Sequence, residues 1–117
     1  WFDQELLAVF GIDVLEHPFD HDRALLYTSN RDVEVWVLQQ ERLDEGLVAL
    51  GATLELDDLK VRSENRGATK SYAAIYEAFK EAIEIPPSYL DQLYGSPMAK
   101  HFYTSEQLKQ FRERWTC

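Results

Sequence analysis

The sequence contains little cysteine and no long hydrophobic run, and each shortage excludes a class of protein. Its one cysteine, Cys117, is the last of 117 residues, which excludes an internal disulfide framework and a cysteine-based zinc site. Cys117 also lacks a local base in the sequence, so we do not expect a catalytic thiol. No apolar run approaches the roughly 20 residues that a membrane-spanning helix needs, so we expect a cytoplasmic protein without a membrane span.

Basic residues are also scarce, since the chain has 12 basic and 21 acidic side chains and a net charge of −9. A general nucleic-acid-binding protein needs an excess of Lys and Arg to neutralise phosphates, so we expect no nucleic-acid partner. The glycine-rich phosphate loop, the G-x-G-x-x-G fingerprint and the G-x-S-x-G nucleophile turn are all absent from the sequence. The sequence alone therefore does not identify a catalytic residue.

One histidine pair resembles a metal site. His17 and His21 are four residues apart, and Asp20 and Asp22 lie beside them. Pro18 prevents a regular helix from placing both imidazoles on one face. We therefore expect an acidic, solvated loop here and no metal.

The composition indicates a folded domain, because 45% of the residues are hydrophobic and 13% are aromatic. The length allows one domain at most. Because the chain begins with Trp1, we expect either a single domain or the C-terminal fragment of a larger one. The predicted parts are a strand-and-helix part over 1–59 and a helical part over 60–117.

The first half alternates between strand and helix patterns, which predicts an α/β fold. The expected elements are a helix over 1–10 ended by Gly11, strands over 24–28, 33–39 and 52–56, and a helix over 41–50 ended by Gly51. The nearly continuous apolar character of 33–39 is typical of a strand covered on both faces in a parallel sheet. Too few strands are present to close such a sheet, so its exposed edge would favour a homo-oligomer or a missing N-terminal segment.

The second half is predicted to be helical. Expected helices span 71–83, which Pro86-Pro87 ends, and 88–94 with Tyr89, Leu90 and Leu93 inward. The apolar stripe of the first helix consists of Tyr72, Ile75, Tyr76, Phe79 and Ile83. A last helix should start at Thr104, because Thr104 and Gln107 have the spacing of a capping box, and should bury Leu108, Phe111 and Trp115. We expect these aromatic residues to be core.

Two short basic segments interrupt the acidic background. Residues 60–70 carry four basic and one acidic side chain, whereas 1–59 carry three basic and fourteen acidic ones. A second segment, 98–117, carries four basic and two acidic side chains. Each segment is either a solvated basic loop or a local anion site.

The candidate anion-binding residues are Arg62, Asn65, Arg66, Gly67, Lys100 and His101. Asn65 and Gly67 permit tight turns that aim N–H groups at an anion, and the segment, which includes Lys70, leads into a helix N-terminus. Lys100 and His101 precede another helix N-terminus, although His101 is equally compatible with a histidine packed among Phe102 and Tyr103. The two segments share one ligand only if the fold brings them together.

Several motifs together resemble one protein family. They are Tyr72-x-x-x-Tyr76-x-x-Phe79, Ile85-Pro-Pro-Ser-Tyr-Leu-Asp-x-x-Tyr94-x-Ser96, Lys100-His-Phe-Tyr and Phe111-x-x-x-Trp115, with Trp1-Phe-Asp, Phe10-Gly-Ile-Asp-Val, His17-Pro-Phe-Asp and 35–43 in the first half. The chain resembles, over essentially its whole length, the C-terminal part of capsular polysaccharide synthesis proteins, a bacterial group similar to sulfotransferases.

The resemblance implies a partial P-loop-like, sulfotransferase-type fold and sulfuryl transfer from 3′-phosphoadenylyl sulfate to a carbohydrate acceptor. The family's phosphosulfate-binding loop would lie before Trp1, so this chain would contribute supporting contacts to the nucleotide or the acceptor through the candidate residues. The alternative is a non-catalytic interaction module of a polysaccharide-synthesis assembly, which uses the acidic first half to bind a basic partner.

Overall fold

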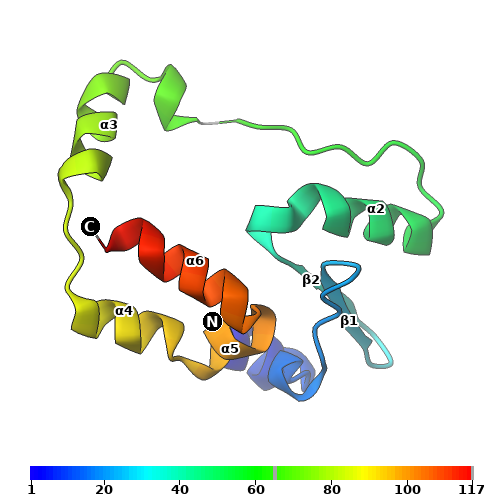
Figure 1. Ribbon diagram of the computed structural model, residues 1–117. Coiled ribbons are helices and arrows are strands. Elements are labelled where there is room, and N and C mark those ends of the chain that lie inside the picture. The colour runs from blue at the N-terminus through cyan, green and yellow to red at the C-terminus, as the bar shows by residue number, and fades with distance from the viewer. Residues whose placement is uncertain (65, 117) are drawn as a thin grey trace. The chain divides into compact units, whose positions relative to one another are not determined.

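The computed structural model describes residues 1–64 and 66–116, which form two compact units that divide between Val61 and Arg62 (Figure 1). Unit 1, residues 1–61, contains a two-stranded sheet with helices, and the described part of unit 2 is helical. The expectation of mixed α and β structure is therefore confirmed. No helix among the described residues is both long and apolar enough to cross a membrane.

Unit 1 opens with a helical segment that ends where the sequence predicts. It consists of η1 (Asp3–Leu7), a π-helical turn, followed by α1 (Ala8–Phe10). Gly11 adopts a left-handed conformation with φ 70°, and its N–H donates to the Leu7 carbonyl, 2.9 Å away. A short 3₁₀ turn, η2 (Val14–Glu16), follows. Glycine permits this reversal because a side chain disfavours positive φ.

The sheet of unit 1 is a hairpin. Strands β1 (Leu25–Ser29) and β2 (Glu34–Leu38) pair antiparallel, with Tyr27 opposite Trp36. Asn30 closes the turn between them, because its Oδ1 accepts hydrogen bonds from the N–H groups of Asp32 and Val33, both at 3.1 Å. Both strands were expected, and so short a connection joins strands only in antiparallel pairing. The parallel sheet that the sequence favoured does not form among the described residues.

The core of unit 1 gathers around strand β1 of the hairpin. Its buried apolar residues are Ile12, Val14, Phe19, Ala24, Leu25, Leu26 and Ala49. β1 supplies the most deeply buried positions, whereas β2 is only half-buried from Val35 to Leu38. The expectation that this second strand is covered on both faces is therefore wrong for the chain described here.

The helix after the hairpin is longer than the sequence suggested. After the 3₁₀ turn η3 (Gln40–Arg42), α2 runs over Leu43–Leu54 and ends at Glu55, which has φ 54°. The expected helix end at Gly51 and the expected strand over 52–56 are both wrong. Gly51 instead lies where a Cβ would approach the Leu56 carbonyl oxygen to 2.9 Å, so it permits a close backbone approach within a continuing helix.

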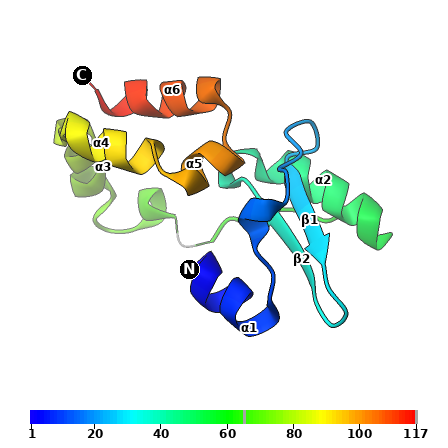
Figure 2. The same ribbon diagram turned by 90° about the horizontal axis from the view of Figure 1, so that it is seen from below.

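Unit 2 ends in three short helices that contact one another. They are α4 (Pro87–Tyr94), α5 (Pro97–Phe102) and α6 (Ser105–Trp115), and Figure 2 shows α6 running alongside the other two. Leu90, Ala99 and Phe102 are their buried residues. Phe111 of α6 lies 5.2 Å from Tyr103 and 6.2 Å from Tyr94, measured between ring centroids.

The sequence analysis predicted two of these helices and missed the third, and the stripe that it expected α6 to bury, Leu108, Phe111 and Trp115, is only half-buried. α6 begins at the expected capping box, in which Gln107 N–H donates to Thr104 Oγ1 and Thr104 N–H donates to Gln107 Oε1. Of the three residues expected to point inward from α4, Leu90 is buried but Tyr89 and Leu93 are exposed. The missed α5 has local start signals, since Ser96 Oγ accepts from the Ala99 N–H and Pro97 occupies the first turn.

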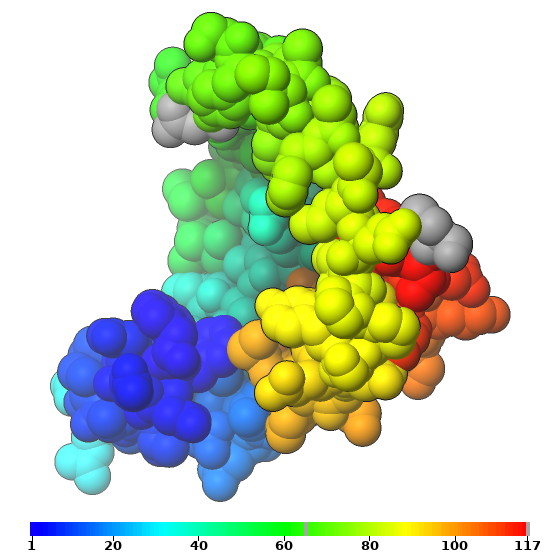
Figure 3. Space-filling view, turned by 90° about the vertical axis from the view of Figure 1, so that its left-hand side faces the viewer, coloured from blue at the N-terminus to red at the C-terminus, as the bar shows by residue number. Residues whose placement is uncertain are grey.

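The first part of unit 2 contains the 3₁₀ turn η4 (Gly67–Thr69) and α3 (Ala73–Ala82). The helix was predicted, but its apolar stripe is exposed. The exposed fractions are 52% for Tyr72, 76% for Ile75, 44% for Tyr76 and 56% for Phe79. Figure 3 shows the surface of this segment in green. The expectation that these residues are core is therefore wrong, because the four side chains stay largely exposed even though Gly67 of unit 2 packs on the Tyr76 ring.

Candidate functional site

The basic loop, residues 60–70, is exposed at its described charged positions. Arg62 Nε lies 2.8 Å from Glu64 Oε1, and 88% of the Arg62 side chain is exposed. Arg66 Nε donates to Ser63 Oγ at 2.5 Å. This hydrogen bond ties the Nε of the Arg66 guanidinium to a serine of the same loop. Asn65, a predicted site residue, lies outside the described residues.

Gly67 connects this loop to α3. A Cβ at Gly67 would lie 3.2 Å from two ring atoms of Tyr76, so the glycine backbone packs against the aromatic ring. Lys80 Nζ lies 4.8 Å from the centroid of the same ring and pairs with Glu77 Oε1 at 2.7 Å. The end of the basic loop and the first two turns of α3 therefore form one local surface.

The N-terminus of α3 suits a negatively charged group. None of the described side chains caps it, and its first turn contains no acidic residue. Lys70 precedes it, with its carbonyl accepting from the Ala73 N–H at 3.0 Å. Unsatisfied N–H groups and the helix dipole both favour an anion at such an end.

Lys100 and His101 lie in the last turn of α5, just before the start of α6. The position before a helix is as expected, but that helix end is already capped, because Thr104 accepts from one of its first N–H groups. The His101 ring packs edge-on against Phe102, with centroids 4.9 Å apart. The packed alternative for His101 thus has a contact to support it, while anion binding by Lys100 and His101 stays a prediction.

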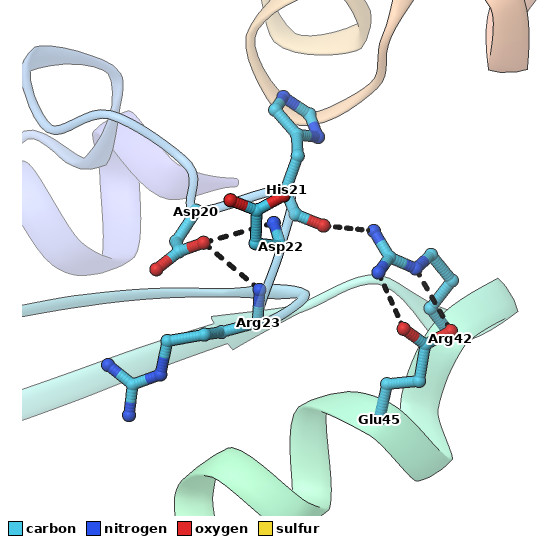
Figure 4. Close-up of polar contacts among 6 residues, drawn as sticks. All are labelled: Asp20, His21, Asp22, Arg23, Arg42 and Glu45. Atoms are coloured by element: carbon cyan, nitrogen blue, oxygen red, sulfur yellow. Dashed lines mark hydrogen bonds and ion pairs between the residues drawn. The ribbon is translucent and has the colours of Figure 1, made fainter.

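Unit 1 has its own polar cluster around the 20–23 turn, shown in Figure 4. Asp20 Oδ1 accepts from the N–H groups of Asp22 and Arg23, both at 3.0 Å. Arg42 donates to the His21 carbonyl at 2.5 Å and forms a two-pronged contact with Glu45, at 2.6 and 3.2 Å. This arrangement ties the turn to the start of α2.

The Arg42–Glu45 contact shifts both pKa values. The hydrogen bond from Arg42 lowers the pKa of Glu45 below its ordinary value, and the same bond raises the pKa of Arg42. Each charged form is favoured because its partner carries the opposite charge. Arg42 is half-buried and Glu45 is exposed, and the pair helps to position the 20–23 turn because Arg42 also donates to the His21 carbonyl.

The two histidines of unit 1 have separate surroundings. His17 Nε2 lies 3.1 Å from Thr28 Oγ1, and the His21 ring packs against Phe19 with centroids 5.0 Å apart. Within residues 1–64 and 66–116, no three His, Cys, Asp or Glu side chains gather to hold a metal ion.

A hollow of about 710 Å³ lies in unit 1, between the second half of α2 and the segment that follows it. Its charged lining consists of Glu55, Asp57, Asp58 and Lys60. An acidic lining disfavours a nucleotide phosphate or a sulfate ester. This hollow therefore lacks the electrostatics that an anionic donor requires, whereas the loop before α3 has them.

Sequence reasoning found the basic loop and the α3 stripe and connected the loop to the helix N-terminus, but it did not connect the loop to the stripe. The packing of Gly67 on Tyr76 joins them. Nothing in the sequence indicated this contact, because Gly67 lies nine residues before Tyr76 and no helical or strand period relates the two positions. The exposure of the stripe was likewise invisible, because an amphipathic pattern shows which residues share a face and not what covers it.

One family of proteins matches this chain. The family described as "Putative capsular polysaccharide synthesis protein" (NKWYS) matches residues 1–104. Comparison with curated proteins and with solved structures finds no match.

Proposed function

Because this chain belongs to the NKWYS family of capsular polysaccharide synthesis proteins, we propose that it is part of a sulfotransferase-like enzyme. In this proposal the enzyme transfers a sulfuryl group from 3′-phosphoadenylyl sulfate to a carbohydrate acceptor of a capsular or surface polysaccharide. The P-loop-like fold typical of sulfotransferases is part of the same proposal.

In the proposed reaction, an acceptor hydroxyl oxygen forms a bond to the sulfur while the bond between sulfur and the phosphate oxygen breaks. The hydroxyl proton passes to a base, and adenosine 3′,5′-bisphosphate leaves. As in phosphoryl transfer, such a reaction depends mainly on positioning and on neutralising the charge of the transferred group. Exposed arginines next to a helix N-terminus can supply that charge.

The observation that supports the proposal is the arrangement at the start of α3. Arg62, Arg66 and Lys70 precede a helix end that no described side chain caps and whose first turn lacks acidic residues. The 117 residues contain no glycine-rich phosphate loop. The proposed contribution of this chain is therefore a supporting contact to the nucleotide phosphates, with Lys100 and His101 as a second contact.

Nucleotide titration tests this proposal. Adenosine 3′,5′-bisphosphate should bind the protein, and Arg66→Ala and Lys100→Ala should each weaken the binding about twofold to fivefold, the range expected for an exposed ion pair. Lys109→Ala is the matched control, because Lys109 is an exposed lysine of α6 whose Nζ lies 4.0 Å from Glu113 Oε1. Unchanged binding in both site variants would remove these residues from the site.

A second candidate function is an interaction module for a basic partner. Of the fourteen acidic side chains in residues 1–59, thirteen are exposed, and only three basic side chains accompany them. Such a surface attracts a positively charged protein at low salt. Complex formation that weakens sharply as salt rises, without any nucleotide binding, would favour this second function.

A further inference from the structure

We propose that the polysaccharide recognised by this protein is acidic and that it binds along the cation–aromatic surface. This surface consists of Arg66, Gly67, Lys70, Tyr72, Ile75, Tyr76, Phe79 and Lys80. The inference rests on the proposed function, because it names the class of the carbohydrate acceptor. The surface shares Arg66 and Lys70 with the proposed nucleotide contacts and adds the exposed aromatic residues of α3 to them.

The aromatic half of the surface is solvent-exposed. Tyr72, Ile75 and Phe79 are 52%, 76% and 56% exposed, and they follow one face of α3 for about 10 Å, at 1.5 Å of rise per residue. Soluble proteins seldom leave such an apolar stripe uncovered unless it binds something. Tyrosine and phenylalanine rings offer flat apolar faces, on which the C–H faces of sugar rings stack.

The cationic half is attached to the aromatic half by direct packing. Gly67 lies against the Tyr76 ring, so Arg66 directly before it is held at the edge of the stripe. Lys80 lies over the same ring, at 4.8 Å from its centroid. Tyr76 is thus fixed by neighbours, while the rings of Tyr72 and Phe79 beside it remain exposed to a ligand.

Charge complementarity selects the occupant. Residues 60–70 have four basic side chains and one acidic side chain, in a protein whose net charge is −9. A polysaccharide with carboxylate or sulfate groups satisfies both halves, because its rings stack and its anions pair with Arg and Lys.

The acidic residues of α3 limit the site. Glu77 lies at the middle of the helix, Glu81 lies near its end, and Glu84 follows it. They would repel both an anionic membrane surface and a long polyanion lying along the whole helix. The basic end near Arg66 and Lys70 should therefore hold the anionic groups, and a short run of sugar residues should cover the stripe.

Calorimetric titration with a hexasaccharide of galacturonic acid tests the inference, with maltohexaose as the neutral comparison. We expect binding of the acidic sugar, little binding of the neutral one, and weaker binding at high salt. Replacing both exposed rings, Tyr72→Ala with Phe79→Ala, should weaken binding about tenfold. Tyr89→Ala is the matched control, since Tyr89 is 55% exposed on α4, and it should leave binding unchanged.

The assays separate this inference from the proposed function. The Tyr72→Ala, Phe79→Ala variant should still bind adenosine 3′,5′-bisphosphate as the unmodified protein does. Nucleotide binding without any binding of the acidic sugar would overturn the inference alone. Sugar binding without nucleotide binding would support the inference and remove the sulfotransferase proposal.

Two further measurements keep the test decisive. Circular dichroism shows whether the double variant folds. If it does not fold, the amide NMR signals of the unmodified protein are followed during sugar titration in its place. On sugar addition, the shifts should concentrate in residues 66–80, and shifts elsewhere would overturn the inference. Preferential binding to phosphatidylglycerol vesicles, or self-association that the double variant abolishes, would assign the surface to a membrane or to a second copy instead.

Discussion

Gly46, in the first half of α2, lies where the helix meets the hairpin. A Cβ at this position would lie 2.6 Å from Leu38 Cδ2, 2.9 Å from the Ala24 carbonyl oxygen and 3.1 Å from Leu38 Cγ. The leucine side chain can turn away, but the carbonyl belongs to the backbone next to β1. Gly46→Ala should therefore force α2 and the hairpin apart.

The expected magnitude is the difference between two opposing effects. Alanine in a helix interior is more favourable than glycine by about 1 kcal/mol. Overpacking against a close-packed backbone costs about 1–3 kcal/mol, and the 2.9 Å approach to a carbonyl places this site toward the upper part of that range. We therefore expect Gly46→Ala to lower the free energy of unfolding by about 1–2 kcal/mol.

Urea denaturation followed by tryptophan fluorescence and circular dichroism measures this change, because Trp36 lies in β2 opposite Tyr27. Ala52→Gly is the matched control in the same helix, at an exposed position, and should cost about 1 kcal/mol through propensity alone. A helix governed only by propensity would respond oppositely to the two changes. A higher denaturation midpoint for Gly46→Ala would refute the close approach of α2 to the hairpin.

Two other changes test local contacts. Thr104→Ala removes the capping box of α6 and should lower stability by about 0.5–2 kcal/mol, measured by urea denaturation; no loss would mean that the cap is not formed in solution. Glu45→Gln tests the ion pair with Arg42, which lowers the pKa of Glu45 below its ordinary 4.5. A lowered pKa stabilises the fold above pH 4.5 and the effect disappears as the pH falls through the folded value, so the variant should be less stable at pH 7 and equal at low pH. A constant difference at both pH values would contradict this.

The secondary structure was largely predictable where the signals were local. The hairpin depends on residues that are close in the sequence, such as Asn30 in its turn. The ends of several helices do so too, as Gly11 shows at the end of α1. The errors came where packing overrode a local signal. Gly51 was interpreted as a helix end, yet it lies within α2, because its lack of a side chain is used for close approach to Leu56.

The charge and the apolar period around α3 were predictable from the sequence, but their arrangement was not. The excess of positive charge over 60–70 is a property of the sequence, and so is the apolar period that places Tyr72, Tyr76 and Phe79 on one helix face. The contact between Gly67 and the Tyr76 ring depends on the path of the chain through η4, which no periodicity encodes.

The sequence by itself determined the elements whose ends are closed by hydrogen bonds between residues that are near one another in the chain. The capping box of Thr104 and Gln107 is an example. Tertiary structure decided which apolar faces are covered, because burial depends on surfaces brought together from distant positions. It buried Leu90 of α4 and left the equally periodic stripe of α3 exposed beside a basic loop. That difference in coverage is why α3, which was expected to be part of the core, is proposed as a binding surface.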